Sequence, residues 1–376
     1  MKIPFNKPYV TGKEIRYIKQ AIASGKISGN GDFTKKCQNF LCNRYKFQNC
    51  LLTTSCTTAL EMSAILIDIK PGDEVIIPSF TFVSSALAFE RQGAKIVFCD
   101  SRDDHPGLDE KKIERLITNR TKAIVVVHYA GIACDMDLIN SLALKYNLYL
   151  IEDAAQAIDS TYKGVPLGQI GHFGCFSFHE TKNIQCGEGG LLVINEERFN
   201  KRAEIIWEKG TNRAEFFRGE VNKYSWVDIG SSFLPSDITA AFLYAQLEKI
   251  DEIQEKRINI WQQYYEGLLP LAQKGIIQLP VIPHYAKNNA HMFYFLCSSL
   301  EERSALIKFL KSHEIGAVFH YLSLHSSPYY SKKYQSPKLP FADMYSDRLL
   351  RLPFYFELSK ESIHKIIKLI RTFYKQ

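Results

Sequence analysis

The stretch CLLTTSCTTALEMSAIL, residues 50–66, carries the pattern that decides the fold. Its first four residues predict a short apolar strand, Thr54 and Ser55 form a polar stop, and residues 57–66 predict a helix. Short apolar strands that alternate with helices are typical of an α/β fold, in which a mostly parallel sheet is covered by helices on both faces. Further strands and helices are predicted downstream at residues 74–77, 83–92, 95–99, 111–117, 123–127, 136–145, 148–151 and 173–178.

Other elements flank this region on both sides. Residues 1–11 contain two prolines and predict an extended N-terminal arm, which leads into predicted helices at 13–24 and 33–45. After residue 245 the pattern changes, and a long charged helix at 247–269 is expected to connect two domains. Shorter elements are predicted beyond it at residues 292–297, 300–313, 317–321 and 360–375. We therefore expect a large domain at 1–245 and a smaller α+β domain at 246–376.

The composition narrows the class of protein. The chain has 376 residues, of which 46% are hydrophobic and 23% charged, as in ordinary globular proteins. The formal net charge is +7, but the basic residues are scattered and do not alternate with aromatics, which argues against nucleic-acid binding. No run approaches the ~18 apolar residues of a membrane span, and Met1-Lys-Ile-Pro-Phe5 has no apolar signal core. These features favour a cytoplasmic protein that binds an anionic small molecule.

The nine cysteines carry no metal-ligand or catalytic pattern. No CxxC pair and no Cys/His cluster has zinc spacing, so no metal is expected, and the thiols are predicted to be reduced and packed as small apolar groups. The P-loop motif is also missing from the sequence, which excludes that type of nucleotide binding. The candidate chemistry must come from other residues.

Polar residues that directly follow the predicted strands are the first candidates, because ligands of open parallel sheets bind at the carboxyl ends of the strands. Thr54-Ser-Cys-Thr57 stands between a strand and a helix. Backbone N–H groups and hydroxyls at a helix N-terminus can bind a phosphate. The alternative is that these residues only cap the helix, which is common.

Asp153 follows the strand predicted at 148–151. A carboxylate at such a place needs a cationic partner when it is buried, and a protonated pyridine nitrogen would be one. The alternative is that Asp153 caps the next helix.

Lys182 follows the strand at 173–178 and precedes Gly187-Glu-Gly-Gly190. A lysine that is desolvated there would be a nucleophilic amine, and the glycines would let the backbone approach a bulky ligand. The alternative is an ordinary solvated lysine. Taken together, an anion site, a carboxylate and a nucleophilic lysine are the parts that pyridoxal phosphate (PLP) requires.

The sequence resembles the sugar-nucleotide aminotransferases of the DegT family, which have the fold type I architecture of PLP enzymes. The resemblance spans nearly the whole chain. The matching stretches are Thr54-Ser-Cys-Thr57, Pro78-Ser-Phe-Thr-Phe82, Glu152-Asp-Ala-Ala-Gln156, Ser177-Phe-His-Glu-Thr-Lys182-Asn, Gly187-Glu-Gly-Gly190, Asp237-Ile-Thr-Ala-Ala241 and His320-Tyr-Leu-Ser-Leu-His325.

The resemblance implies a role for each matching position. Lys182 would bond to the cofactor and act as general base, Asp153 would pair with the ring nitrogen, and Gln156 would lie beside the ring hydroxyl. Phe82 would stack on the ring, and the alternative is that it is a core aromatic. A histidine that stands alone is usually structural. The other implied contacts are Ser55, Cys56, Thr57 and Ser177 at the phosphate, and His179, His291 and His325 on the substrate side.

Two departures from the family pattern concern the neighbouring subunit and the cofactor loop. The family usually has Asn-x-Arg ahead of the stretch at 237–241, and the Asn reaches the cofactor phosphate of a partner subunit. Ser232 and Leu234 stand there in this chain. A homodimer with shared sites is still expected, with Ser232 as the candidate donor. The stretch between Lys182 and the glycines is also one residue shorter than in the most similar subfamily.

The stretches 208–218 and 228–236 resemble the subfamily that makes dTDP-4-amino-4,6-dideoxygalactose for bacterial polysaccharides such as O-antigen and enterobacterial common antigen. The resemblance implies that glutamate donates its amino group to C4 of dTDP-4-keto-6-deoxyglucose. Three alternatives remain at this stage. They are amination at C3, a sugar dehydratase of the same fold, in which a histidine replaces the lysine, and a regulator that binds a sugar nucleotide without catalysis.

Overall fold

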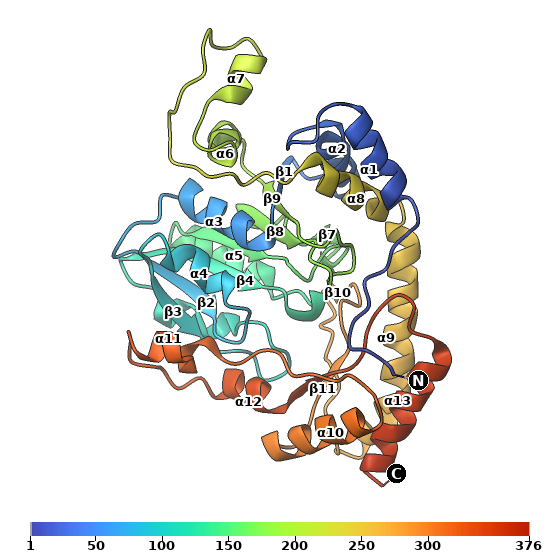
Figure 1. The fold of residues 1–376 in the computed structure, drawn as a ribbon. Helices are drawn as coiled ribbons and strands as arrows, with labels where there is room; N and C mark the ends of the chain where they lie inside the picture. The colour runs from blue at the N-terminus through green and yellow to red at the C-terminus, as the bar shows by residue number, and fades with distance from the viewer. Residues whose placement is uncertain (1, 376) are drawn as a thin grey trace.

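A seven-stranded sheet lies at the centre of the computed structural model, which describes residues 2–375 (Figure 1). Its strands stand in the order β1-β9-β8-β5-β4-β2-β3, and within this sheet only β9 runs antiparallel to its neighbours. The mostly parallel α/β sheet predicted from the sequence is therefore confirmed. The strands are β1 (Asn49–Thr53), β2 (Glu74–Pro78), β3 (Lys95–Cys99), β4 (Thr121–Val127), β5 (Tyr149–Asp153), β8 (Phe173–Ser177) and β9 (Gly190–Ile194).

Helices cover both faces of the sheet because alternate side chains of its apolar strands point to opposite faces. In β2, Val75 and Ile77 pack into one hydrophobic core, whereas Ile76 between them packs into the other. The first core contains residues of α3 (Cys56–Leu66), α4 (Ser84–Glu90) and α6 (Asn200–Trp207). The second contains residues of α1 (Glu14–Ala23), α2 (Asp32–Tyr45), α5 (Met136–Lys145) and α8 (Asp237–Leu247).

The long helix α9 (Ile250–Gln273) joins the sheet region to a separate core (Figure 1). Its first turn packs Ile250 and Ile253 into the second core, and its later turns pack Ile260 and Leu268 into a third. The elements after it are β11 (Tyr294–Leu296), α10 (Leu300–Ser312), α11 (Pro328–Ser331), α12 (Pro340–Arg348), β12 (Leu349–Arg351) and α13 (Lys360–Phe373). The division into domains at residue 245 stays a prediction.

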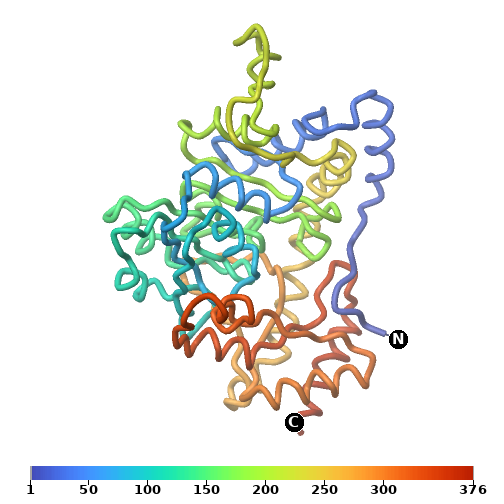
Figure 2. The backbone as a smooth tube through the Cα atoms, turned by 60° about the vertical axis from the view of Figure 1, so that its left-hand side comes forward, coloured from blue at the N-terminus to red at the C-terminus, as the bar shows by residue number. Residues whose placement is uncertain are grey.

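The N-terminal arm runs from α1 along the molecule to the third core (Figure 2). The Gly316 amide donates to the Ile3 carbonyl over 2.9 Å, and the Phe354 amide donates to the Phe5 carbonyl over 3.1 Å. Ile3 is buried in the third core. The arm therefore links the two ends of the molecule and brings Phe5 toward the space between them.

Two predicted elements differ from the structure. The helix expected at 111–117 is replaced by two single 3₁₀ turns, Glu110–Lys112 and Glu114–Leu116, because only Ile113 of this short segment is buried in a core. The strand expected at 317–321 is reduced to one bridge between Val318 and Arg351, because the chain turns into the cavity described below at His320.

Several short elements were not predicted from the sequence. Strand β9 follows directly on a glycine-rich stretch, whose composition favours a loop. The other unpredicted elements are β6 (Thr161–Tyr162), β7 (Val165–Pro166), β10 (Ala286–Lys287), β12, α6, α7 (Arg213–Phe217), α8, α11, α12 and the 3₁₀ turns Tyr129–Gly131, Glu197–Phe199 and Leu324–Ser326. All nine cysteines are free thiols. Over residues 2–375, no helix has the length and apolarity required to cross a bilayer.

Candidate active site

A cavity of about 510 Å³ opens where the carboxyl ends of the central strands meet the β12 region. Strands β4, β5 and β8, the N-terminus of α3 and the N-terminal arm each supply part of its wall. It is lined by Phe5, Ser55, Cys56, Thr57, Leu60, Thr81, Phe82, Ser84, Val127, Asp153, Ala155, Gln156, Ser177, His179, Thr181, Lys182, Glu188, His291, His320, Tyr321 and Arg351.

The N-terminus of α3 forms one wall of the cavity. The Ser55 hydroxyl caps the helix by accepting a hydrogen bond from the Thr58 amide over 3.2 Å, and the Thr58 hydroxyl accepts from the Ser55 amide over 3.0 Å. This reciprocal cap leaves the amides of Cys56 and Thr57 at the positive end of the helix dipole. These amides are the donors that a phosphate requires.

Gly190 allows the turn before α3 to pass against β9. A Cβ at residue 190 would overlap the Ser55 carbonyl and would stand 2.5 Å from the Cys56 nitrogen. Ser177 ends the neighbouring strand β8 and also lines the cavity. The anion site is thus built from three elements that only the fold brings together.

Asp153 ends strand β5 on the cavity floor and is 5% exposed. The Ser85 hydroxyl donates to its Oδ2 over 2.6 Å, and the Ala155 amide donates to its Oδ1 over 3.1 Å. Burial raises the pKa of Asp153 above its usual value, although these two hydrogen bonds and the charge of Lys182 oppose the effect. A buried carboxylate of this kind gains stability when a cationic ligand group meets it.

Lys182 reaches the same cavity from the loop after β8. Burial lowers the pKa of Lys182 to about 8, and the positive charge of Arg351 acts in the same direction, against the charge of Asp153. A substantial fraction of the amine is therefore neutral at physiological pH, which is the state that a nucleophile or base requires.

Gln156 and Phe82 also line the cavity. The side-chain Oε1 of Gln156 accepts a hydrogen bond from the Ala130 backbone amide over 2.6 Å, and its Nε2 donates to the Tyr321 hydroxyl over 3.3 Å. The Phe82 ring is 53% exposed, and its centroid stands 5.7 Å from that of Tyr321. An exposed aromatic ring in a cavity offers a face on which a flat ligand can stack.

The histidines predicted for the substrate side separate into two groups. His179 and His291 line the cavity. Nδ1 of His179 is 2.9 Å from the Thr181 hydroxyl, and Nδ1 of His291 is 2.8 Å from the side-chain Oδ1 of Asn183. His325 is not among the residues that line the cavity, and its role on the substrate side stays a prediction. It is buried behind β2, with Nδ1 2.8 Å from the Ser79 hydroxyl.

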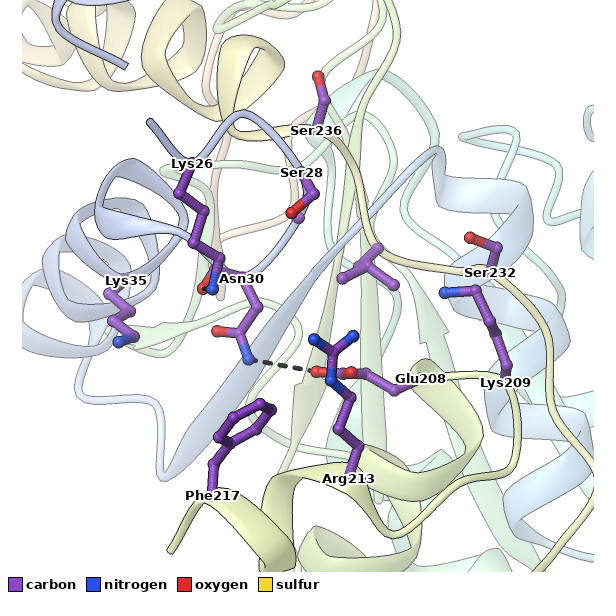
Figure 3. Close-up of a pocket in the computed structure, with 12 residues that line it drawn as sticks. Lys26, Ser28, Asn30, Lys35, Glu208, Lys209, Arg213, Phe217, Ser232 and Ser236 are labelled. Atoms are coloured by element: carbon purple, nitrogen blue, oxygen red, sulfur yellow. Dashed lines mark hydrogen bonds between the residues drawn. The ribbon is translucent and has the colours of Figure 1, made fainter. Parts of the chain in front are cut away.

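Ser232 lies outside the cavity, in a second pocket of about 580 Å³ (Figure 3). The figure shows it near Lys209, with Asn30, Glu208 and Arg213 across the pocket; the Asn30 amide donates to Glu208 over 3.3 Å. The full lining is Lys26, Ser28, Gly29, Asn30, Lys35, Glu208, Lys209, Arg213, Phe217, Ser232, Leu234 and Ser236. Within one chain, Ser232 is therefore not part of the wall around Lys182.

The sequence did not single out Phe5, His320, Tyr321 and Arg351 as site residues. The hexapeptide from His320 to His325 matches the family pattern, but the resemblance implies a role only for His325. Arg351 stands in an apolar strand, and Phe5 stands far from the other site residues along the chain. A charged residue in an otherwise apolar strand is the signal that could have identified Arg351.

The fold and this cavity define a PLP-dependent aminotransferase. The chain belongs to the DegT/DnrJ/EryC1/StrS aminotransferase family, whose pattern it matches over residues 8–371. It is 34% identical to GDP-perosamine synthase of Escherichia coli O157:H7 over 99% of this chain and 98% of that one. It is 30% identical to the spore coat polysaccharide biosynthesis protein SpsC of Bacillus subtilis, over 99% and 97%.

Solved structures give the same assignment. The PLP form of the putative sugar aminotransferase Spr1654 from Streptococcus pneumoniae has a TM-score of 0.91 to this chain at 27% identity, over 99% of this chain and 98% of that one. Its PMP form matches equally well. The cofactor is therefore PLP. The site residues fit it. Asp153 is a buried carboxylate without an ion pair among residues 2–375, Phe82 presents an exposed ring, and the missing side chain of Gly190 leaves room for the turn before α3.

Proposed function

We propose that this enzyme transfers the amino group of glutamate to C4 of a nucleotide-linked 4-keto-6-deoxy sugar, with dTDP-4-keto-6-deoxyglucose as the first candidate. The observation that carries the chemistry is the meeting of Lys182, Asp153 and the α3 N-terminus in one cavity. PLP, when bound, supplies an electron sink and carries the amino group between the two substrates.

Lys182 is the proposed acid–base residue. Its Nζ would take the proton from the donor Cα and pass it on within the first half of the reaction, and it would deliver a proton to C4 of the sugar in the second half. The lowered pKa of Lys182 suits this role, because a general base works best when its pKa lies near the working pH. Asp153 keeps a proton on the cofactor ring nitrogen, and Ser85 holds the Asp153 carboxylate in place over 2.6 Å.

The other residues that line the cavity bind and orient the cofactor and the sugar. The amides of Cys56 and Thr57, with the Ser177 hydroxyl, hold the cofactor phosphate, whereas Gln156 meets the ring hydroxyl and Phe82 covers one ring face. His179 and His291 face the sugar. These assignments rest on the cavity lining and on the sequence resemblance together.

The sugar and its nucleotide are assigned on sequence similarity. The stretches 208–218 and 228–236 favour a dTDP-linked substrate aminated at C4. The relative named GDP-perosamine synthase supports a second candidate, a GDP-linked sugar. Both substrates lead to the same amino-transfer chemistry, so the distinction concerns only the nucleotide and the sugar ring.

A homodimer with shared sites is part of the proposal. Ser232 stands in a pocket whose lining includes Lys26, Lys35, Lys209 and Arg213. Such a basic pocket suits the phosphates of a cofactor or nucleotide held by the other subunit.

The test begins with the absorption spectrum of the purified enzyme with and without glutamate. We expect a yellow band that glutamate bleaches and that a keto-sugar nucleotide restores. The dTDP-linked and GDP-linked 4-keto-6-deoxy sugars are then compared, and NMR of the product locates the amine at C4 or C3. A yellow band that glutamate leaves unchanged would exclude glutamate as donor, and an amine at C3 would exclude the proposed position.

A further inference from the structure

Two cysteine thiols are in contact between helix α2 and strand β1. Sγ of Cys42, near the end of α2, lies 3.5 Å from Sγ of Cys50, near the start of β1. Among residues 2–375, no other pair of cysteine sulfurs is in hydrogen-bond contact. Neither cysteine lines the active-site cavity. The pair is therefore a chemical feature that the proposed amino transfer does not use.

The contact between α2 and β1 fixes the places of the two sulfurs. Gln38, one turn before Cys42 on α2, donates from its side-chain Nε2 to the Cys50 carbonyl over 2.8 Å. The backbone carbonyl of Gln38 accepts a hydrogen bond from the Cys50 thiol over 3.6 Å. On its other side, β1 pairs with β9, where Cys50 stands opposite Val193. Because both backbones are held, the sulfurs stay neighbours, and a disulfide requires them to approach by only about 1.5 Å.

The two thiols differ in exposure and in acidity. Cys42 is half-buried and reaches solvent, whereas Cys50 is 2% exposed. Hydrogen bonds with the thiol and the backbone of Cys50 lower the pKa of Cys42 below its usual value, although burial opposes them. The same thiol contact and burial raise the pKa of Cys50. Cys42 is therefore the thiol that ionises and meets a reagent from solvent, and Cys50 is the second thiol held behind it.

Cys186 shows how a partly exposed cysteine is placed without such a partner. It stands between Lys182 and the glycine-rich stretch, and its thiol donates to the Glu188 carbonyl over 3.4 Å. Burial of the thiol raises the pKa of Cys186. No second cysteine sulfur of residues 2–375 is in contact with it. Oxidation of Cys186 would stop at a single sulfur, whereas oxidation of Cys42 has Cys50 as the next reactant.

We propose that Cys42 and Cys50 form a redox modification site, at which a peroxide converts the two thiols into a disulfide that links α2 to β1. The Cys42 thiolate attacks one oxygen of the peroxide, the O–O bond breaks, and Cys42 becomes a sulfenic acid. The Cys50 sulfur then attacks the Cys42 sulfur, the S–O bond breaks, and the hydroxyl leaves as water with the proton of the Cys50 thiol. With hydrogen peroxide, two thiols and one peroxide give one disulfide and two waters, so the sulfurs are oxidised and the peroxide oxygens are reduced.

The disulfide lies on the strand that leads to the α3 N-terminus. Strand β1 ends at Thr53, and Ser55 caps α3 two residues later. A small dithiol such as dithiothreitol would reduce the S–S bond and restore both thiols, so the modification is reversible. The proposal requires neither an amino donor nor a sugar, and its test is therefore separate from the test of amino transfer.

The test oxidises the PLP-loaded enzyme with hydrogen peroxide and counts the thiols that remain. Reduced wild type, Cys42→Ser and the control Cys186→Ser are oxidised, acidified to stop thiol exchange, and alkylated under denaturing conditions before the intact mass is measured. We expect wild type and Cys186→Ser each to lose two alkylatable thiols and the mass of two hydrogen atoms, and Cys42→Ser to lose neither. Dithiothreitol should restore all nine thiols of wild type. Peptide mapping should place the link between Cys42 and Cys50.

The variant Cys50→Ala tests the order of the two steps. Without the second thiol, the sulfenic acid of Cys42 should persist, and dimedone should label Cys42 roughly tenfold more than in wild type. Labelling of Cys186 should be the same in both proteins. Circular dichroism gives the folding control. If Cys50→Ala fails to fold, the comparison of Cys42→Ser with wild type carries the test, since the side chain of Cys42 is partly exposed.

Several results would overturn the proposal. One is nine alkylatable thiols in wild type after a peroxide dose that consumes an equal amount of free cysteine. A second is oxidation of Cys42 to a sulfinic acid without a link to Cys50. Loss of two thiols in Cys42→Ser would assign the link to another pair of cysteines. A disulfide between two chains, seen as a doubled mass on a non-reducing gel, would contradict the contact of both sulfurs within one chain.

Discussion

The surroundings of Lys182 give its side-chain amine a pKa that differs from that of an ordinary lysine. Burial, helped by the charge of Arg351, lowers its pKa to about 8, whereas an exposed lysine stays protonated until far higher pH. In the proposed function, the neutral amine is the form that bonds to the cofactor aldehyde. We therefore predict that the rate at which the protein without cofactor binds added PLP rises about tenfold per pH unit below 8 and levels off above it.

This pH profile can be measured by rapid mixing, from the growth of the absorption band at each pH. Arg351→Gln removes one positive charge near Lys182, so its profile should shift to higher pH. A profile that still rises steeply at pH 10 would mean that Lys182 has the pKa of an ordinary exposed lysine.

Asp153 and Lys182 are predicted to be individually required for amino transfer. Lys182→Ala should abolish turnover, because it removes both the attachment point and the base. Asp153→Asn should retain the fold and lose activity by roughly 100-fold or more, because general acid–base and electrostatic groups contribute at that scale. Steady-state rates with circular dichroism as the folding control give the measurement. Full activity in either variant would remove its assigned role.

The sequence predicted the site residues that directly follow strands, and it missed those that depend on distant contacts. Asp153 and Lys182 could be identified because parallel strands bring their carboxyl ends to one edge of the sheet. Arg351 reaches the cavity through its bridge to Val318, and Phe5 reaches it through the N-terminal arm. Neither tertiary contact can be deduced from the neighbouring residues, although the charge of Arg351 within an apolar strand marks that residue. His325 lies outside the cavity lining because the chain turns away from the cavity after Tyr321.

At the level of elements, sequence periodicity predicted most of the strands and helices of the central region. It did so because buried parallel strands are short and wholly apolar, whereas the helices between them are longer. Strand β9 was missed because its first residue, Gly190, belongs to a glycine-rich stretch that composition alone assigns to a loop. The glycine serves the packing of β9 against the α3 cap, which is a tertiary requirement.

Glu152 fixes the loop after β7 to the central sheet. Its carboxylate accepts hydrogen bonds from the amides of Gly168, Ile170 and Gly171, each over 2.7 Å, and its Oε2 lies 3.1 Å from Nε2 of His128. The side chain is fully buried. We predict that Glu152→Gln lowers the free energy of unfolding by about 2–3 kcal/mol, because the amide group cannot accept all of these bonds.

Urea unfolding followed by tryptophan fluorescence measures this loss. The control is Glu197→Gln, which makes the same chemical change at an exposed position and should stay within about 0.5 kcal/mol of wild type. Equal stability of Glu152→Gln and wild type would mean that water or a rearranged loop replaces the carboxylate.

At the level of the whole molecule, the segment from α7 to residue 229 stands out from the body (Figure 1). It carries several apolar side chains in water: Phe217 is 69% exposed and Trp226 is 83% exposed. It lies next to the basic pocket that contains Ser232, and Phe217 lines that pocket. An exposed aromatic surface beside this basic pocket suits the proposed contact with a second copy of this chain.

We predict that replacing Phe217 and Trp226 together by alanine weakens the homodimer, because two large aromatic side chains at the centre of an interface supply much of its binding energy. Light scattering after gel filtration should give twice the 43.1 kDa chain mass for wild type, and a mass that falls toward that of one chain on dilution for the variant. Affinity for PLP should fall with the mass if the partner subunit contributes Ser232 to the phosphate. Leu144→Ala, at a 73% exposed position on α5, is the matched control and should remain dimeric. A wild-type protein that is monomeric at all concentrations, yet aminates its sugar, would show that each chain contains a complete site.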